Sequence, residues 1–182
     1  SLLEVMAEQQ VTVDGHAYAL ESPFMVIATQ NPVEYQGTYP LPEAQLDRFM
    51  LCLRLGYPNL EQELAMLYDH EHSLPLQQLL PVLTPADICA VQKSVQAVAV
   101  HRDIGTYIIK LVDATRKHAA IQLGASPRAG LALFQAVKAR ALLAGRDFVL
   151  PEDVKSLAPV VLAHRLQLDA KARYQGIGKE GV

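Results

Sequence analysis

The chain has 182 residues, of which 51% are hydrophobic and 6% aromatic. Its 16 basic and 19 acidic residues are interspersed and leave a net charge of -3, so the composition gives no electrostatic footprint for nucleic acid. Since no apolar run approaches the roughly 20 residues of a membrane span and no signal peptide is visible, we expect a cytoplasmic globular protein whose partners are nucleotide and protein.

Cysteine and histidine positions give no sign of a metal centre. Cys52 and Cys89 lie in apolar contexts without the spacing of metal ligands. Two such residues are typical of buried free thiols in a reducing compartment. His70-Glu71-His72 falls at the polar end of a predicted helix with no third ligand nearby, which favours a solvated helix end. The sequence therefore predicts no metal ligands of its own.

Short apolar runs alternate with turns in the first part of the chain. Residues 11–13 and 18–20 flank Asp14-Gly15, a two-residue turn signal that predicts a β-hairpin. Residues 24–29 are almost uninterrupted in apolar character, as expected of a strand that is covered on both faces. Leucine alternates with other residues over 51–55 and predicts a further strand. The pattern indicates an α/β region.

Beyond Pro58 the apolar period becomes helical. Thr84-Pro85, Ser126-Pro127 and Leu150-Pro151 each predict a helix start with proline at the first helical position, the first two with a capping hydroxyl. Gly145 ends the second of these helices about five turns after its start. Apolar stripes predict helices at Leu60, Leu64, Leu67 and Tyr68; at Ile88, Val91, Val95 and Val98; at Ile104, Ile108, Leu111 and Val112; at Phe134, Val137 and Ala141; and at Val154, Leu157 and Val161.

Asn31 follows the predicted strand at 24–29, and Pro32 biases it toward an extended conformation. In a parallel sheet the carboxyl ends of the strands face the ligand crevice. An amide there can donate to a phosphate oxygen while it accepts from an attacking water. The alternative is an ordinary Asn-Pro turn.

Two arginines occupy positions that suit phosphate. Arg48 closes a short helix opened by Pro42 and Glu43, and its guanidinium can make bidentate contact with phosphate. A surface pair with Asp47, worth little energy, is the alternative. Arg128 lies in the first turn of a predicted helix, where a cation is unfavourable by about 0.3 to 1 kcal/mol. A bound phosphate would explain it, and a solvent-facing arginine is the alternative.

The chain lacks the sequence that grips a nucleotide. Its sole Gly-Lys pair, Gly178-Lys179, has neither the earlier glycine nor the following hydroxyl of a phosphate-binding loop. The apolar run at 108–114 contains one acid, Asp113, and has helical spacing, so it is not the Asp-Glu strand that holds magnesium. The chain also starts at Ser1 inside an apparent helix. We therefore expect it to be the second half of a longer protein.

Three stretches together resemble the MoxR family of AAA+ ATPases: Ala28-Thr29-Gln30-Asn31-Pro32, the segment from Gly37 to Phe49, and Ser126-Pro127-Arg128-Ala129. The resemblance extends from Leu2 to about Leu168. It implies α/β followed by all-α: the C-terminal part of an AAA+ αβα core with a β-hairpin insert, then a helical lid domain.

On this basis three regions are expected. Residues 1–57 would be the C-terminal part of the nucleotide-hydrolase core, and residues 58–168 the α-helical lid. Residues 169–182 are polar and Gly-rich and are predicted to form a flexible tail.

The resemblance also implies roles for the polar residues. Asn31 would be sensor 1, Arg48 the arginine finger that reaches the neighbouring subunit's nucleotide, and Arg128 the sensor 2 arginine that couples the lid to the γ-phosphate. ATP and Mg2+ would bind between core and lid and need the missing N-terminal half, so this chain alone is expected to be inactive. The family implies a homo-oligomeric ring, a hexamer, that remodels or matures partner proteins, including ones with a von Willebrand A domain.

Other functions are open on sequence grounds. A magnesium-chelatase-like or replicative-helicase-like AAA+ motor is one alternative, although a helicase would want a basic, aromatic pore hairpin and residues 11–20 offer only Asp14 and His16 as potentially charged groups. That hairpin could point toward a ring's pore or simply cover the core. A non-catalytic helical interaction module is the other alternative, but it would need none of Asn31, Arg48 and Arg128.

Overall fold

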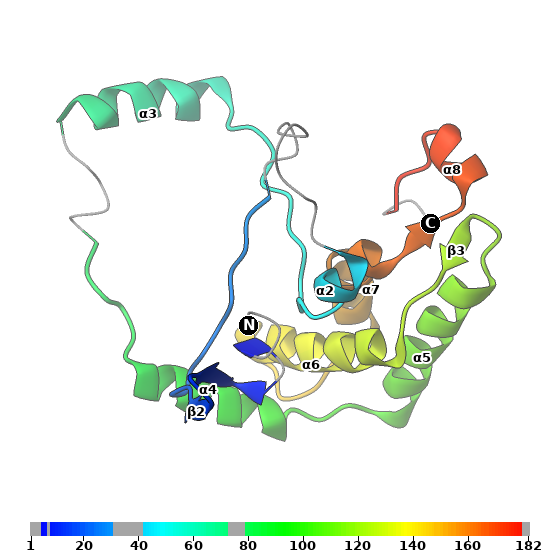
Figure 1. The fold of residues 1–182 in the computed structure, drawn as a ribbon, viewed down its shortest axis with the longest axis horizontal. Helices are drawn as coiled ribbons and strands as arrows, with labels where there is room; N and C mark the ends of the chain where they lie inside the picture. Colours follow the sequence, from blue (N-terminus) through cyan, green and yellow to red (C-terminus); the bar gives the residue numbers. More distant parts are fainter. Residues whose placement is uncertain (1–4, 7, 31–41, 73–78, 180–182) are drawn as a thin grey trace.

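The computed structural model describes residues 5–6, 8–30, 42–72 and 79–179 (Figure 1). The elements, in chain order, are β1 (Gln10–Val13), β2 (His16–Ala19), α2 (Glu43–Leu46), α3 (Leu60–His72), α4 (Pro85–Ala97), α5 (Arg102–Lys117), β3 (Ile121–Leu123), α6 (Pro127–Leu143), α7 (Pro151–Leu162), the 3-10 helix η2 (Ala163–Arg165), β4 (Gln167–Leu168) and α8 (Ala170–Tyr174).

The predicted hairpin is confirmed. Strands β1 and β2 pair antiparallel, with Val11 opposite Tyr18 and Val13 opposite His16. The two turn residues, Asp14 and Gly15, have φ angles of 50° and 79°. Positive φ at both central positions is the requirement of the type I′ turn, whose twist matches that of the flanking strands.

The strands predicted at 24–29 and 51–55 are not formed. Neither segment belongs to the described sheets, which are the β1–β2 and β3–β4 pairs. Met25 and Ile27 are 75% and 76% exposed, so the expected cover on both faces is also missing among the described residues. A strand is defined by hydrogen bonds to a neighbouring strand, and an apolar run without such a neighbour stays extended coil.

The expected burial of the two cysteines is likewise wrong. Cys52 is exposed and Cys89 is half-buried, and both are free thiols. Helix α4, which carries Cys89, contains no fully buried residue. The apolar residues around these cysteines are therefore not fully buried by other described parts of the chain.

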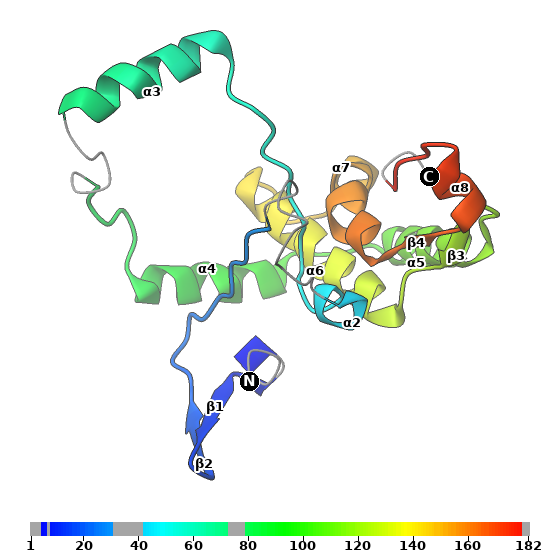
Figure 2. The same cartoon turned by 45° about the horizontal axis from the view of Figure 1, so that its top comes forward.

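The hydrophobic core lies in the second half of the chain, around α6. Helices α5 and α7 both pack on α6, and α4 contacts it as well. Figures 1 and 2 show α3 well away from these packed helices in both views. The largest fully buried side chains come from the three central helices: Ile108, Val112, Leu133, Val137, Val154 and Val161. All but Leu133 belong to the predicted apolar stripes, and Phe134 of the α6 stripe is half-buried. Each fully buried side chain contributes on the order of 1.5 to 3 kcal/mol of burial free energy.

The predicted helix boundaries are confirmed at their capping residues. The Thr84 side chain accepts a hydrogen bond from the Asp87 N–H, and the Asp87 carboxylate accepts one from the Thr84 N–H, forming a capping box. At the start of α6 the Ser126 hydroxyl accepts from the Ala129 N–H. At its end Gly145 has a φ of 73°, and its N–H donates to the Leu142 carbonyl in a Schellman-type cap.

The end of the chain differs from the flexible tail predicted for 169–182. Strand β4 pairs antiparallel with β3, with Leu168 opposite Ile121. Helix α8 then follows, capped by the Asp169 side chain, and buries Ala172 at 3% exposure. Within the described residues, no helix has the length and apolar character needed to cross a membrane.

A single acidic side chain is buried among the described residues, at the first turn of α7. Asp153 is 3% exposed and accepts hydrogen bonds from both terminal nitrogens of Arg146 at 2.9 and 2.7 Å. It also accepts from the Leu150 N–H, and Arg140 lies 3.3 Å away. The hydrogen bonds from Arg146 are the main reason that the pKa of Asp153 is lowered. The carboxylate therefore fixes the α6–α7 connection.

Replacing Asp153 with alanine should destabilise the chain by about 1 to 3 kcal/mol, because the Leu150 N–H and the Arg146 guanidinium lose a charged, buried acceptor. Urea unfolding followed by circular dichroism measures this. Asp113→Ala, which removes an exposed pair with Lys117, is the control and should cost less than about 1 kcal/mol. Equal losses in the two variants would contradict the structural role of Asp153.

The same carboxylate predicts a pH dependence. Because its folded-state pKa is lowered, its stabilisation is complete above its unfolded-state pKa of about 4 and is lost as pH falls through the lower folded-state value. The stability difference between the natural chain and Asp153→Asn should therefore shrink between about pH 5 and pH 2. A difference that is constant over that range would contradict the assigned shift.

Replacing two of the glycines with alanine should change the stability of the chain in opposite directions. A Cβ at Gly124 would lie 2.7 Å from the backbone N and Cα of Arg116, whereas a Cβ at Gly105, inside α5, meets nothing within 4 Å. Gly124→Ala should cost about 1 to 3 kcal/mol through overpacking. Gly105→Ala should stabilise by up to about 1 kcal/mol through helix propensity. Thermal melts of both variants test this, and the same sign for both would contradict it.

Candidate functional site

The three predicted site residues differ in their location and exposure. Asn31 lies outside the described residues. Arg48 is half-buried in the turn that follows α2, where its N–H donates to the Gln45 carbonyl at 3.2 Å. The predicted short helix is confirmed, and it ends at Leu46 rather than at Arg48 itself. Arg128 is exposed in the first turn of α6, as its sequence position predicts.

Asp47 does not pair with its neighbour Arg48 but faces the helical region. Its carboxylate lies 3.2 Å from Nε of Arg165, and the Ser126 hydroxyl lies 3.4 Å from each of its oxygens. The Arg165 side chain is 2% exposed and that of Asp47 is 31% exposed. Ser126 caps the helix that carries Arg128. This group of side chains therefore joins the Arg48 turn to the start of α6.

The backbone of the Arg48 turn is held at a second point. The Phe49 carbonyl accepts a hydrogen bond from Nη2 of Arg165 at 2.7 Å and lies 3.1 Å from Nε2 of His164. Burial is the main cause that lowers the pKa of His164, and the nearby charge of Arg165 acts in the same direction. A neutral imidazole with its proton on Nε2 fits the carbonyl acceptor.

The site is rich in positive charge for its degree of burial. Burial is the largest cause that lowers the pKa of Arg165, the Asp47 carboxylate opposes it, and the charge of Arg128 lowers it further. His164 Nδ1 and the Nε and Nη1 atoms of Arg165 are buried without a hydrogen-bond partner, so the 3.2 Å contact of Nε with Asp47 is an ion pair rather than a hydrogen bond. Two guanidinium groups that act on each other beside a helix N-terminus favour an anionic ligand at the exposed one, which is Arg128.

Sequence reasoning missed His164 and Arg165. Both follow the apolar α7 stripe and are typical of an ordinary polar helix end, yet the pair is flanked by Ala163 and Leu166, which are buried. A cation inside such an apolar segment is the one signal that could have singled it out. Its partners, Asp47 and Phe49, are more than a hundred residues away in the chain, and no local pattern predicts such a pair.

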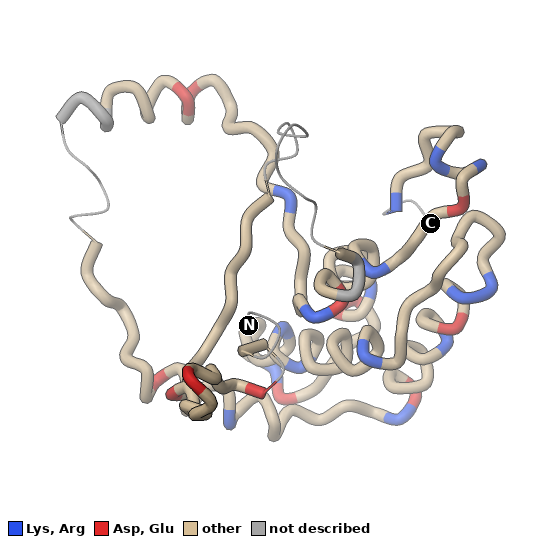
Figure 3. Tube along the Cα trace, viewed as in Figure 1, with Lys and Arg blue, Asp and Glu red and all other residues tan. Residues whose placement is uncertain are grey.

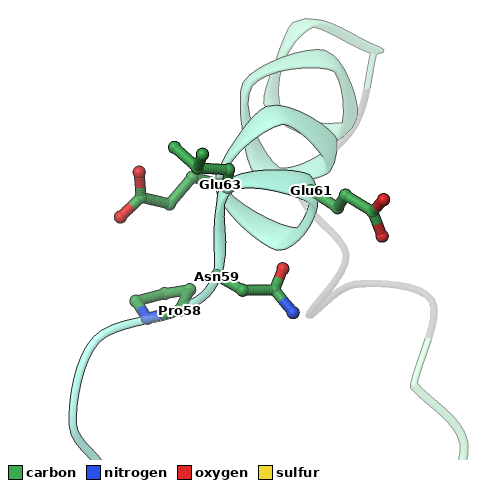
Figure 4. A pocket seen from close by; sticks show the side chains of 5 residues that line it. Pro58, Asn59, Glu61 and Glu63 are labelled. Carbon is green, nitrogen blue, oxygen red and sulfur yellow. The ribbon is translucent and has the colours of Figure 1, made fainter.

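Other features of the described residues do not form a site. A shallow hollow of about 680 Å³ is lined by Pro58, Asn59, Leu60, Glu61 and Glu63 at the start of α3 (Figure 4). Its amide and carboxylates belong to the capped first turn, where Asn59 and Gln62 exchange hydrogen bonds. Figure 3 shows basic and acidic positions interspersed along the described chain, and no group of three metal-ligating side chains is found there.

Known proteins resemble the chain over its full length. Residues 1–51 match the family described as "ATPase family associated with various cellular activities (AAA)", and residues 113–180 match the "AAA lid domain". YeaC of Bacillus subtilis is 50% identical over 182 residues, which cover 100% of this chain and 57% of that protein. Chaperone MoxR1 of Mycobacterium tuberculosis is 40% identical over 191 residues, which cover 100% of this chain and 50% of that protein.

A solved structure agrees with these matches. A crystal structure from Cytophaga hutchinsonii, provisionally named an ATPase, superposes with a TM-score of 0.90 at 40% identity, covering 97% of this chain and 56% of that one. The chain thus spans about half the length of the curated relatives it matches. Both the predicted family and the predicted fold class are confirmed: the chain belongs to the MoxR family of AAA+ ATPases and corresponds to its C-terminal portion, which includes the helical lid.

Proposed function

We propose that this chain is the arginine-bearing half of an ATP hydrolysis site in a MoxR-type ring. ATP and Mg2+ would bind in the full-length protein between the core and the lid, with the phosphate-binding loop and the magnesium-binding acids supplied by residues outside this chain. The ring, a cytoplasmic hexamer, would use hydrolysis to remodel or mature partner proteins, including ones with a von Willebrand A domain. The name of the relative MoxR1, a chaperone, supports this class of activity.

Each polar residue has a proposed role. Asn31 would polarise the attacking water as sensor 1, and Arg48 would stabilise transition-state charge on the neighbouring subunit's nucleotide. Arg128 would contact the γ-phosphate as sensor 2 and couple it to the lid. These assignments make residues 1–57 part of the core and 58–168 the lid, with the described hydrophobic core lying between Val98 and Ala172.

The observation that carries the proposal is the contact between the Arg48 turn and the Arg128 helix. Asp47 and Ser126 contact each other directly, and Arg165 lies 3.2 Å from Asp47. The Asp47–Ser126 contact joins the turn of an arginine proposed to serve the neighbouring subunit's nucleotide to the helix of an arginine proposed to serve its own, an arrangement that a non-catalytic adaptor would not need. A magnesium-chelatase-like motor would use the same arrangement and differ in its client.

The isolated chain should bind no ATP measurably, because the phosphate-binding loop normally supplies most phosphate contacts. Isothermal titration calorimetry with magnesium ATP measures this on the purified chain, with the full-length protein as the positive control. Micromolar binding by the chain alone would contradict the proposed division of the site.

Arg48→Ala in the full-length protein should leave ATP binding nearly intact and reduce turnover by as much as about 10³- to 10⁵-fold, because a finger serves mainly the transition state. Arg128→Ala should also disturb nucleotide affinity.

Mixed rings show which subunit each arginine serves. Subunits that carry Arg48→Ala are combined with subunits that have intact arginines but a disabled magnesium-binding acid. We expect these mixed rings to recover ATP hydrolysis. If verified mixed rings recover no hydrolysis, Arg48 does not act on the neighbouring subunit's nucleotide. The same mixture with Arg128→Ala tests whether Arg128 acts in its own subunit.

A further inference from the structure

The segment from Asp47 to Cys52 contacts the end of α7 and the following η2 at three points. Arg165 contacts the Asp47 carboxylate at 3.2 Å, and Arg165 and His164 reach the Phe49 carbonyl at 2.7 and 3.1 Å. Beyond them the Cys52 N–H donates to the Val160 carbonyl at 2.9 Å. Helix α2, which precedes the segment, also contacts η2. Arg48 therefore lies between Asp47 and Phe49, each of which contacts the Arg165 side chain.

Stability alone does not explain a guanidinium at position 165. Its side chain is 2% exposed, and neither Nε nor Nη1 has a hydrogen-bond partner. Removing such a charge from water is costly, and apolar residues of similar volume often serve a core equally well. What only the guanidinium provides is the combined contact with the Asp47 carboxylate and the Phe49 carbonyl, one residue on each side of Arg48.

The same contact leads to the start of α6. The Ser126 hydroxyl lies 3.4 Å from both Asp47 oxygens and caps the helix in which Arg128 stands two residues later. A shift of this helix end relative to η2 would change the surroundings of Asp47 directly, because its carboxylate contacts both Ser126 and Arg165. The backbone that carries Arg48 is thus mechanically tied to the helix that carries Arg128.

We infer that Arg165 is a positioning residue for Arg48: by binding Asp47 and the Phe49 carbonyl it sets the arginine finger from the lid side and links its placement to the α6 N-terminus. The inference rests on the proposed function, in which Arg48 contributes to ATP hydrolysis. Arg165 itself does not touch nucleotide in this assignment. Its effect on the reaction passes entirely through Arg48.

The test is a double-mutant cycle in the full-length protein, read as steady-state ATPase kinetics. Arg165→Met removes the donors at similar side-chain length and should lower kcat by about 10- to 100-fold, as expected for a misplaced catalytic group, with little change in the KM for ATP. Arg165→Lys keeps the charge and should retain an intermediate kcat. In an Arg48→Ala background Arg165→Met should produce no further loss, because the residue through which it acts is gone.

A merely structural role gives a different pattern. It would lower kcat by the same factor with or without Arg48, and that result, or an unchanged kcat in Arg165→Met, overturns the inference while the finger role stands. Full activity of Arg48→Ala would overturn the finger role and the inference together. Arg102→Met, an exposed arginine at the start of α5, is the control and should behave as the natural protein. If Arg165→Met fails to fold, Asp47→Asn removes the partner charge without a change of shape and should show the same dependence on Arg48.

Discussion

The contact between Arg165 and the Asp47–Phe49 segment is the constraint on which the site depends. It joins a turn near the start of the chain to a 3-10 helix near its end, across 116 residues. Without it, the turn that carries Arg48 would contact the lid through His164 and the Phe49 carbonyl, the Ser126 hydroxyl and Asp47, the Cys52–Val160 backbone bond and the α2–η2 contact. The arrangement holds the residues on either side of the arginine proposed to meet the nucleotide.

Helix α6 has two tasks that lie on different parts of its surface. Its length supplies the buried face formed by Leu133, Val137 and Ala141, around which α5 and α7 pack. Its first turn supplies Ser126 and Arg128, whose neighbours are polar or charged. Because the helix is fixed by its core face and by the Asp153 pair at the following turn, its N-terminus is presented by a rigid element. Rigid support is what the phosphate contact proposed for Arg128 requires.

Local chemistry made some elements predictable from sequence. Thr84, Ser126 and Gly145 mark helix ends through interactions within a few residues of each, so the cap geometry follows from the sequence around them. Asp14-Gly15 predicts its hairpin for the same reason. The runs at 24–29 and 51–55 were wrongly predicted as strands because pairing depends on a distant neighbour, which the described residues do not include. Arg165 was not predicted because its contacts are with Asp47 and Phe49, which no local sequence pattern connects with it.

The account is tested most directly by a structure of the full-length ring with a non-hydrolysable ATP analogue and magnesium. It predicts that the Arg48 guanidinium lies within hydrogen-bond distance, about 3 Å, of the γ-phosphate bound to the adjacent subunit, while Arg165 still contacts Asp47 and the Phe49 carbonyl. A ring in which every site is filled, but Arg48 points to solvent or the Arg165 contacts are broken at the hydrolysis-competent sites, would contradict it.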